Sequence, residues 1–222
     1  MASITENISY VRQQIALAAT QADRSASDIT LLAVSKKQSP DKIRLAYEAG
    51  QRHFGENYVQ EALEKIHSLS LNEIVWHFIG PIQSNKTRDI ANNFAWAHSV
   101  ERLKIARRLS EQRDPALPAL NVCVQVNLSG EQSKSGVAIE EAKQLCEEVA
   151  KLPSLRLRGL MAIPAAGASA CDYAPLNTLF KELQKDLPSM DTLSIGMSGD
   201  FAAAIAAGST LVRIGTAIFG ER

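Results

Sequence analysis

The side chains best suited to chemistry stand directly after short apolar runs of the sequence. Lys36 follows the run at residues 29–34, between Ser35 and Lys37. A lysine at such a place is either an exposed charge, which is the usual fate of lysine, or a partly desolvated amine that attacks aldehydes to form a Schiff base. Side chains alternate between the two faces of a strand, so only one of Lys36 and Lys37 can face a given site, and the parity of the run favours Lys36.

Two glycine-containing turns form the second candidate element. Residues 196–199 (GMSG) and 213–216 (RIGT) each follow an apolar run and precede an expected helical segment. Glycine lets backbone N–H groups approach an oxyanion closely, and the start of a helix favours negative charge. The same pattern occurs in ordinary tight turns. The sequence therefore leaves two alternatives open, an anion site or a pair of structural turns.

The histidines and cysteines do not form a catalytic or metal-binding pattern. His77 and His98 are expected near strand ends but have no metal-ligand spacing with Cys, Asp or Glu, so we predict structural or supporting roles and no metal site. The three cysteines are an odd number without a C-x-x-C pair, which fits neither a disulfide framework nor a zinc ribbon. They favour a reducing compartment, and we expect a cytoplasmic protein.

These candidates need a frame that brings strand ends together, and the order of the elements predicts one. A leading helix is expected from the apolar spacing of Ile4, Ile8, Val11 and Ile15. Eight apolar runs then alternate with helical patterns, which indicates parallel strands joined by right-handed crossovers. The predicted strands are residues 29–34, 53–55, 75–79, 95–98, 121–126, 155–162, 192–195 and 210–214.

Eight strand–helix units predict an α/β fold, a single (β/α)8 TIM-type barrel with an additional N-terminal helix, as one domain over residues 1–222. The active face of such a barrel is the rim at the carboxyl ends of its strands, where the lysine and both glycine turns fall. A doubly wound open sheet is the alternative. Its dinucleotide-binding form needs G-x-G-x-x-G after the first strand, and the sequence lacks that triplet there.

Composition narrows the class of partner. The 24 Lys and Arg residues balance the 24 Asp and Glu residues, and a formal net charge of zero argues against nucleic acid as the main partner. The N-terminal residues lack a signal-peptide pattern, and the longest apolar runs are far shorter than a membrane span, so no membrane partner is expected. No surface stripe demands a dimer, and we expect a monomer.

Long motifs in a fixed order resemble a known family, the YggS/PROSC family of pyridoxal phosphate homeostasis proteins. The resemblance runs from the leading helix to Arg222 and implies a barrel like the N-terminal domain of alanine racemase, with pyridoxal 5′-phosphate in its mouth. The motifs that carry it are LAVSK at 32–36, FGENYVQE at 54–61, WHFIGP at 76–81, QSNK at 83–86, SKSG at 133–136, RGLMAIP at 158–164, MS at 197–198 and VRIGTAIFG at 212–220.

The resemblance also implies a role for individual residues of this sequence. Lys36 is the lysine that would form the internal aldimine, and Arg213 would lie near the pyridine nitrogen. The residues expected to hold the phosphate are Ser198, Gly215 and Thr216, with help from the amide of Gly199; those expected to line the ring are Asn57 and Met161; and Lys134 is expected on a loop near the mouth. Gly199 stands where close relatives are expected to have an acidic residue.

The residues around the cofactor also bear on activity. An arginine beside the pyridine nitrogen disfavours its protonation, which weakens the ring as an electron sink and argues against aminotransferase or decarboxylase chemistry. An amino-acid racemase of the alanine racemase type is the alternative; it needs a second base, for which Tyr58 or His77 would be candidates, because the second domain that supplies a tyrosine in alanine racemase is missing. A barrel for another phosphorylated metabolite is a third possibility.

The preferred hypothesis, which rests on the resemblance, is a protein that is not an enzyme. It would hold pyridoxal 5′-phosphate, limit the free aldehyde and supply it to pyridoxal phosphate-dependent apo-enzymes.

Overall fold

The computed structural model describes residues 3–129, 135–164 and 169–221. Eight parallel strands close into a barrel, because β1 pairs with both β2 and β9 and β4 pairs with β5. The strands in order around the ring are β1 (Thr30–Val34), β2 (His53–Glu56), β3 (Val75–Phe78), β4 (Trp96–Val100), β5 (Leu120–Asn127), β7 (Leu155–Ala162), β8 (Thr192–Met197) and β9 (Leu211–Ile214). The predicted barrel is confirmed.

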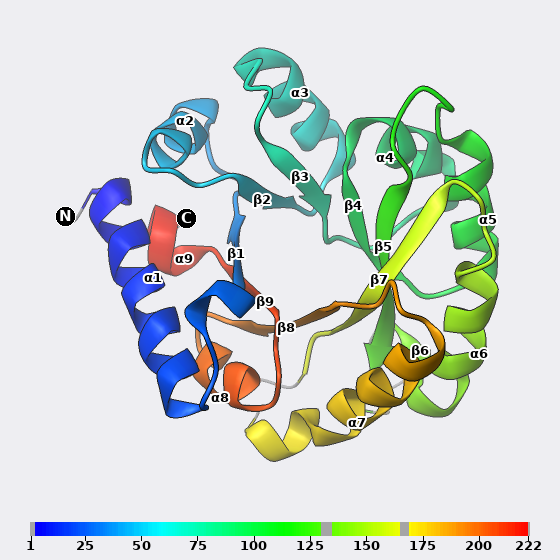
Figure 1. Cartoon of the computed structure of the whole chain (residues 1–222). Helices are drawn as coiled ribbons and strands as arrows, with labels where there is room; N and C mark the ends of the chain where they lie inside the picture. The colour runs from blue at the N-terminus through cyan, green and yellow to red at the C-terminus, as the bar shows by residue number, and fades with distance from the viewer. Residues whose placement is uncertain (1–2, 130–134, 165–168, 222) are drawn as a thin grey trace.

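A ring of helices surrounds the strands (Figure 1). The helices are α1 (Ile4–Gln21), α2 (Pro40–Glu48), α3 (Val59–Leu69), α4 (Thr87–Asn93), α5 (Leu103–Gln112), α6 (Ile139–Val149), α7 (Ala170–Asp186), α8 (Phe201–Ala206) and α9 (Thr216–Phe219), with 3-10 turns η1 (Ala26–Asp28) and η2 (Ser84–Lys86). Within the described ranges, none of these helices is both long and apolar enough to cross a membrane.

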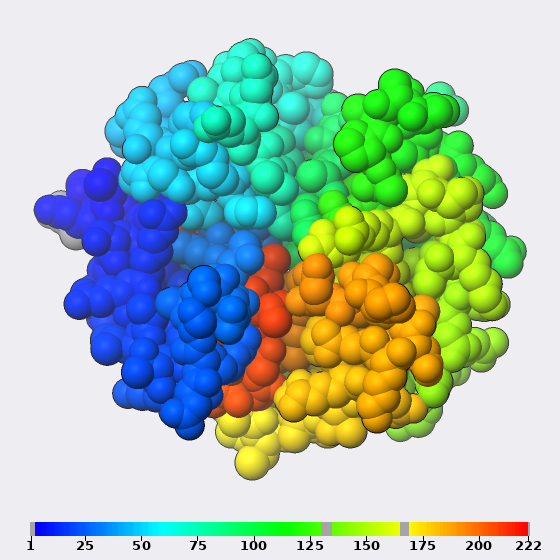
Figure 2. Space-filling model, viewed as in Figure 1, coloured from blue at the N-terminus to red at the C-terminus, as the bar shows by residue number. Residues whose placement is uncertain are grey.

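The leading helix α1 closes the outer layer over the last strand–helix unit. Ser3 and Glu6 form a capping box at its start, and Ile8, Val11 and Ile15 are buried at helical spacing. The Asn7 side chain donates a hydrogen bond to the Ile218 carbonyl at 2.9 Å. In the space-filling view, the blue segment around β1 lies beside the red segment of β9, as their pairing requires (Figure 2).

The strands read as nearly continuous apolar runs because both of their faces are covered. Outward side chains such as Leu31 and Ala33 pack against the helices in the main core, and Trp96, Cys123 and Met161 form a separate buried cluster. This arrangement leaves the strand ends as the places where polar side chains can gather.

The structure differs from the predicted elements in two places. The fourth strand was predicted to end at residue 98, whereas β4 extends to Val100, which is fully buried. A two-residue strand, β6 (Val137–Ala138), pairs with β5 outside the ring and was not predicted. Apolar spacing cannot separate a strand end from a helix start in a short run, and it has no period in two residues.

Candidate functional site

A cavity of about 190 Å³ lies at the carboxyl ends of the barrel strands. It brings together residues of β1, β8 and β9 and residues that directly follow β1, β2, β3, β7, β8 and β9. Its lining consists of Val34, Lys36, Asn57, Ile79, Ile163, Met197, Ser198, Arg213, Gly215 and Thr216. A second cavity of about 340 Å³ shares Asn57, Ile79 and Ile163 and continues toward Gln125 and Ser135. The two cavities together form the mouth of the barrel.

Six of the eight residues predicted to contact a cofactor line this cavity. They are Lys36, Asn57, Ser198, Arg213, Gly215 and Thr216. Met161 is fully buried with Trp96 and Cys123 and is not among the lining residues. Gly199 is exposed but is also not among them. Lys134 lies outside the described residues.

The turn that carries Lys36 resolves which of the two neighbouring lysines faces the mouth. Lys36 is half-buried and lines the cavity, whereas Lys37 is exposed. Lys37 has a left-handed backbone with φ of 61°, so the chain bends sharply directly after Lys36. The Gln38 amide donates to the Ser35 carbonyl at 3.0 Å, which closes this turn before α2 begins.

Helix α3 fixes the backbone on both sides of Lys36. The Lys65 ammonium donates to the Ser35 carbonyl at 2.8 Å, and the Lys37 amide donates to the Glu61 carboxylate at 2.5 Å. Lys65 also pairs with Glu56 at 2.8 Å and with Glu61 at 2.5 Å. Lys65 is only 4% exposed, so its contacts with the Ser35 carbonyl and with Glu56 are shielded from water and hold the turn, whereas the bond between the Lys37 amide and Glu61 is exposed.

Glu56 is the buried anion of this group. Its Oε1 accepts from the Ser35 hydroxyl at 2.7 Å and from Lys65, while its Oε2 is buried with no hydrogen-bond partner among the described residues. Burial raises the pKa of Glu56, and the positive charge of Lys65 opposes that rise. Lys65 was not predicted from the sequence, and the available signal was its place on the otherwise apolar buried face of α3.

Arg213 is the charged wall of the cavity opposite this turn. It is 4% exposed, and one guanidinium nitrogen donates to the Ser194 carbonyl at 2.6 Å and to the Ser194 hydroxyl at 2.9 Å. The other terminal nitrogen donates to the Ala162 carbonyl at 2.9 Å. Burial lowers the pKa of Arg213 to about 10, so the side chain remains a cation at neutral pH.

The two glycine turns meet beside Arg213, as an anion site would require. Gly196 has φ of 94°, and a Cβ there would lie 2.7 Å from the Ala204 methyl group, so the turn needs glycine. Asp200 holds the loop, since its carboxylate accepts from the Met197 amide and from the Tyr173 hydroxyl, both at 2.6 Å. The hydroxyls of Ser198 and Thr216 are exposed at this rim and supply donors for an anion.

Asn57 offers an unused acceptor to the same cavity. Its Oδ1 is buried and has no hydrogen-bond partner among the described residues. Its backbone is fixed by close approach of Gly80, where a Cβ would lie 2.2 Å from the Asn57 carbonyl oxygen. A buried polar atom without a partner is unfavourable, so this oxygen fits a site that a polar ligand completes. An amine, a guanidinium, hydroxyl donors and a free acceptor around one cavity together suit a phosphorylated aromatic aldehyde.

Histidines form a connected file inside the barrel, which the sequence did not reveal. His53 Nδ1 lies 2.9 Å from His77 Nε2, and His77 Nδ1 lies 2.9 Å from His98 Nε2. His98 Nδ1 lies 3.0 Å from the Ser194 hydroxyl that accepts from Arg213. No group of three or more His, Cys, Asp or Glu side chains in the described part of the chain is arranged to hold a metal.

Comparison with known proteins identifies the family. The sequence family model described as the alanine racemase N-terminal domain matches residues 4–222 of this chain. A pyridoxal phosphate homeostasis protein of Escherichia coli K12 is 52% identical, covering 100% of this chain and 98% of its own, and one of Pseudomonas aeruginosa is 56% identical, covering 100% and 97%. The chain belongs to this family. The resemblance seen in the sequence motifs of the homeostasis proteins is thereby confirmed.

Solved structures of this family share the fold. PipY of Synechococcus elongatus without PLP has a TM-score of 0.87 at 36% identity and covers 98% of this chain and 100% of its own. PipY with PLP bound has a TM-score of 0.85 at 35% identity, with the same coverage. Alanine racemase of Corynebacterium glutamicum has a TM-score of 0.72 at 15% identity, and this chain covers 60% of it, so that likeness shows the barrel fold alone.

Proposed function

We propose that this chain holds pyridoxal 5′-phosphate by a covalent bond to Lys36 and releases it to other proteins, without catalytic turnover of its own. The observation that carries the proposal is the single cavity that joins the half-buried Lys36 to Arg213 and the two glycine turns. The names of the homeostasis relatives and the PLP-bound structure of PipY support it. When bound, the cofactor supplies an aldehyde that condenses reversibly with amines.

Each polar group that lines the cavity has a defined part in this proposal. The hydroxyls of Ser198 and Thr216 and the backbone at Gly215 bind the phosphate, and Arg213 faces the ring nitrogen, where its positive charge disfavours a proton. Asn57 presents its free carbonyl oxygen to a donor on the ligand. Gly199 and Met161 do not line the cavity, so the proposal assigns neither a direct contact.

The racemase alternative needs a second base on the opposite face of the cofactor. Both candidates for that role lie away from the cavity lining: Tyr58 is 51% exposed, and His77 is fully buried in the histidine file. Among the described lining residues, Lys36 is the one side chain that could accept a proton from a substrate carbon. This supports holding and release over racemisation.

Borohydride reduction followed by peptide mass spectrometry tests the covalent bond. Protein incubated with pyridoxal 5′-phosphate should carry one reduced label on Lys36, and Lys36→Ala should lose both the label and the visible absorption. Lys37→Ala is the matched control, since Lys37 is exposed and adjacent, and it should be labelled like the wild type. Label on another lysine in the wild type would overturn the proposal.

The absence of turnover is tested by α-proton exchange of L-amino acids in heavy water. The proposal predicts exchange far slower than ordinary enzyme rates. Turnover above about 1 per second would identify an enzyme instead.

We propose further that the chain acts as a monomer in the cytoplasm and passes its cofactor to pyridoxal phosphate-dependent apo-enzymes. Cys123 and Cys146 are buried free thiols and Cys171 is an exposed one, which suits a reducing compartment. Sedimentation equilibrium tests the monomer. Activation of an apo-enzyme by the loaded protein, with free cofactor trapped, tests delivery.

A further inference from the structure

The histidine file joins the cavity wall to the opposite end of the barrel. It begins at Arg213 on β9, continues through Ser194 on β8 and His98 on β4, and ends through His77 on β3 at His53 on β2. Each step is a hydrogen bond of 2.9 or 3.0 Å. Four of the five side chains are buried, and His53 is the half-buried terminus.

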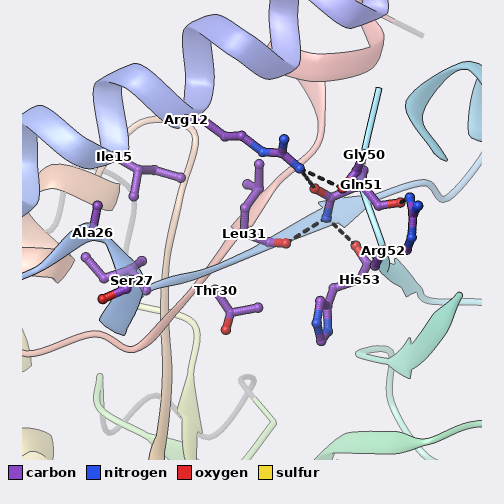
Figure 3. Close-up of a pocket in the computed structure, with 11 residues that line it drawn as sticks. Arg12, Ile15, Ala26, Ser27, Thr30, Leu31, Gly50, Gln51, Arg52 and His53 are labelled. Carbon is purple, nitrogen blue, oxygen red and sulfur yellow. Dashed lines mark hydrogen bonds between the residues drawn. The ribbon is translucent and has the colours of Figure 1, made fainter. Parts of the chain in front are cut away.

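His53 opens on the amino-terminal end of the barrel. It lines a cavity of about 580 Å³ under α1 and another of about 460 Å³ between the strand starts. Figure 3 shows its ring turned away from Arg12 and Gln51, whose amide donates to the Leu31 and His53 carbonyls at 2.7 Å. The file therefore reaches water at the end of the molecule opposite the lysine.

The donors fix one direction along the file. The Arg213 guanidinium can only donate, so it occupies a lone pair of the Ser194 oxygen. The Ser194 hydroxyl has two partners among the described residues, Arg213 and His98, so its hydrogen points to His98 Nδ1. If His98 donated instead, the Ser194 hydrogen would be buried without an acceptor.

This direction passes from ring to ring, because a neutral imidazole has one donor and one acceptor. His98 then carries its proton on Nε2 and donates to His77, which does the same toward His53, whose Nε2–H faces the cavities. Burial lowers the pKa of His77 and His98, that of His98 to about 3 with the charge of Arg213 contributing, so both rings are neutral. The Trp96 ring stacks on the His77 ring, with 5.2 Å between the ring centroids, and this contact holds the file in place.

We propose that Ser194, His98 and His77 are positioning residues for Arg213, and that the file they form makes the hold on the cofactor depend on protonation of His53 at the far end of the barrel. The cofactor part of this inference rests on the proposed function. The direction of the hydrogen bonds along the histidine file does not rest on the proposed function.

Protonation of His53 reverses the direction of donation in the hydrogen bonds from His53 to Ser194. An imidazolium donates from both nitrogens, so His53 Nδ1–H would require His77 Nε2 as an acceptor, and His77 and His98 would in turn donate toward Ser194. Two donors would then meet the Ser194 oxygen and its own hydrogen would lose its acceptor, which loosens Arg213. The cavities around His53 are also lined by the neutral ring of His77 and by five charged side chains, which are Arg12, Arg52, Asp28, Arg158 and Asp191.

Imidazole nitrogen NMR of the protein without cofactor tests the direction. At pH 7.5 all three rings should show the Nε2–H tautomer. Acid titration of His53 should shift the His77 and His98 nitrogens with it, at a pH below the ordinary imidazole value, since burial lowers the pKa of His53. His53→Gln keeps an acceptor for His77 but cannot be protonated, so its two remaining rings should stay in the Nε2–H form. An Nδ1–H proton on His98 at pH 7.5 would overturn the proposal.

Release of cofactor from the loaded protein tests the consequence. The wild-type release rate should rise by about threefold or more as His53 titrates, beyond the change seen in His53→Gln. Ser194→Ala should release faster at every pH, and His67→Gln, which alters an exposed histidine on α3, should follow the wild type. Identical profiles for His53→Gln and wild type would refute the coupling. If the wild type bound no cofactor, the proposed function would fail, while the NMR result would still decide the file.

Discussion

Lys65 shows how one buried side chain sets the geometry of another. It forms ion pairs with Glu56 and Glu61 and donates a hydrogen bond to the Ser35 carbonyl next to Lys36. Lys65→Met would leave Glu56 buried without its cation, a change that destabilises by about 3–5 kcal/mol in buried pairs. We expect that loss in urea unfolding, together with weaker labelling of Lys36.

The matched control for this prediction is Lys143→Met. Lys143 pairs with Glu182 at 2.9 Å, but both side chains are about half exposed, so water and salt screen the pair. Its loss should leave the unfolding free energy nearly unchanged. Equal effects of the two substitutions would contradict the role given to Lys65.

Because His77 and His98 are fully buried, we expect the free energy of unfolding to fall in mild acid. Burial holds the pKa of His98 near 3 and that of His77 well below its usual value, whereas in the unfolded chain both rings titrate near 6.5. The unfolded state therefore takes up protons that the folded state refuses, and the stability present above pH 6.5 is lost as the pH falls. His98 should contribute a loss of about 1.5 kcal/mol between pH 6.5 and 5, and His77 should contribute a loss in the same direction.

Urea unfolding at a series of pH values measures this loss. Most carboxylates are still ionised above pH 5, so the histidines dominate this interval. His67→Gln should leave the slope unchanged, because His67 is exposed. A flat profile from pH 6.5 to 5 would show that the rings are protonated in the folded protein.

At the scale of elements, the turns after the strands depend on close backbone approach. A Cβ on Gly80 would lie 2.2 Å from the Asn57 carbonyl oxygen, a contact that neither backbone can accept without moving. Gly80→Ala should destabilise the protein by about 1–3 kcal/mol and shift the turn that presents Asn57, which lowers labelling of Lys36. Calorimetry and the borohydride assay measure both effects.

Gly199→Ala is the matched substitution. Nothing lies within 4 Å of the Cβ position at Gly199, and its φ is not positive. The change should stay within about 0.5 kcal/mol and leave the label on Lys36 intact. A large loss of binding would mean that Gly199 contacts the ligand directly.

The elements were largely predictable from sequence because strands covered on both faces are apolar throughout. The eight predicted runs match β1 to β5 and β7 to β9, and no strand end differs from its prediction by more than two residues. The cavity was predictable for the same reason, since Lys36 and Arg213 follow or end such runs. Lys65 escaped prediction because a lysine on a helix is usually at the surface. The histidine file escaped because His53, His77 and His98 become neighbours only once β2, β3 and β4 align.

At the scale of the whole molecule, α1 and the residues directly after it connect the first strand–helix units to the last ones. Asn7 reaches the Ile218 carbonyl, Arg12 the Gly50 carbonyl at 2.9 Å, and Arg24 the Ile205 and Ser209 carbonyls at 2.9 and 2.6 Å. These bonds tie α1 and the segment after it to the turns before β2 and β9 and to the helices α8 and α9. The two glycine turns and the turn that carries Lys36 follow strands of one closed ring, so a ligand that bridges them should stabilise the entire fold.

That bridging predicts a graded response to ligands. Pyridoxal 5′-phosphate at one hundred times its dissociation constant should raise the free energy of unfolding by about 2.7 kcal/mol, because it binds only the folded chain. Lys36→Ala retains the two glycine turns that are proposed to bind the phosphate, and it should keep part of this gain. Pyridoxal, which lacks the phosphate, should stabilise the wild type less at equal concentration. Thermal unfolding with each ligand measures the three cases. If inorganic phosphate protected the wild type as well as pyridoxal 5′-phosphate did, and no label reached Lys36, the barrel would bind a different phosphorylated metabolite, because the amine would then contribute nothing to the complex.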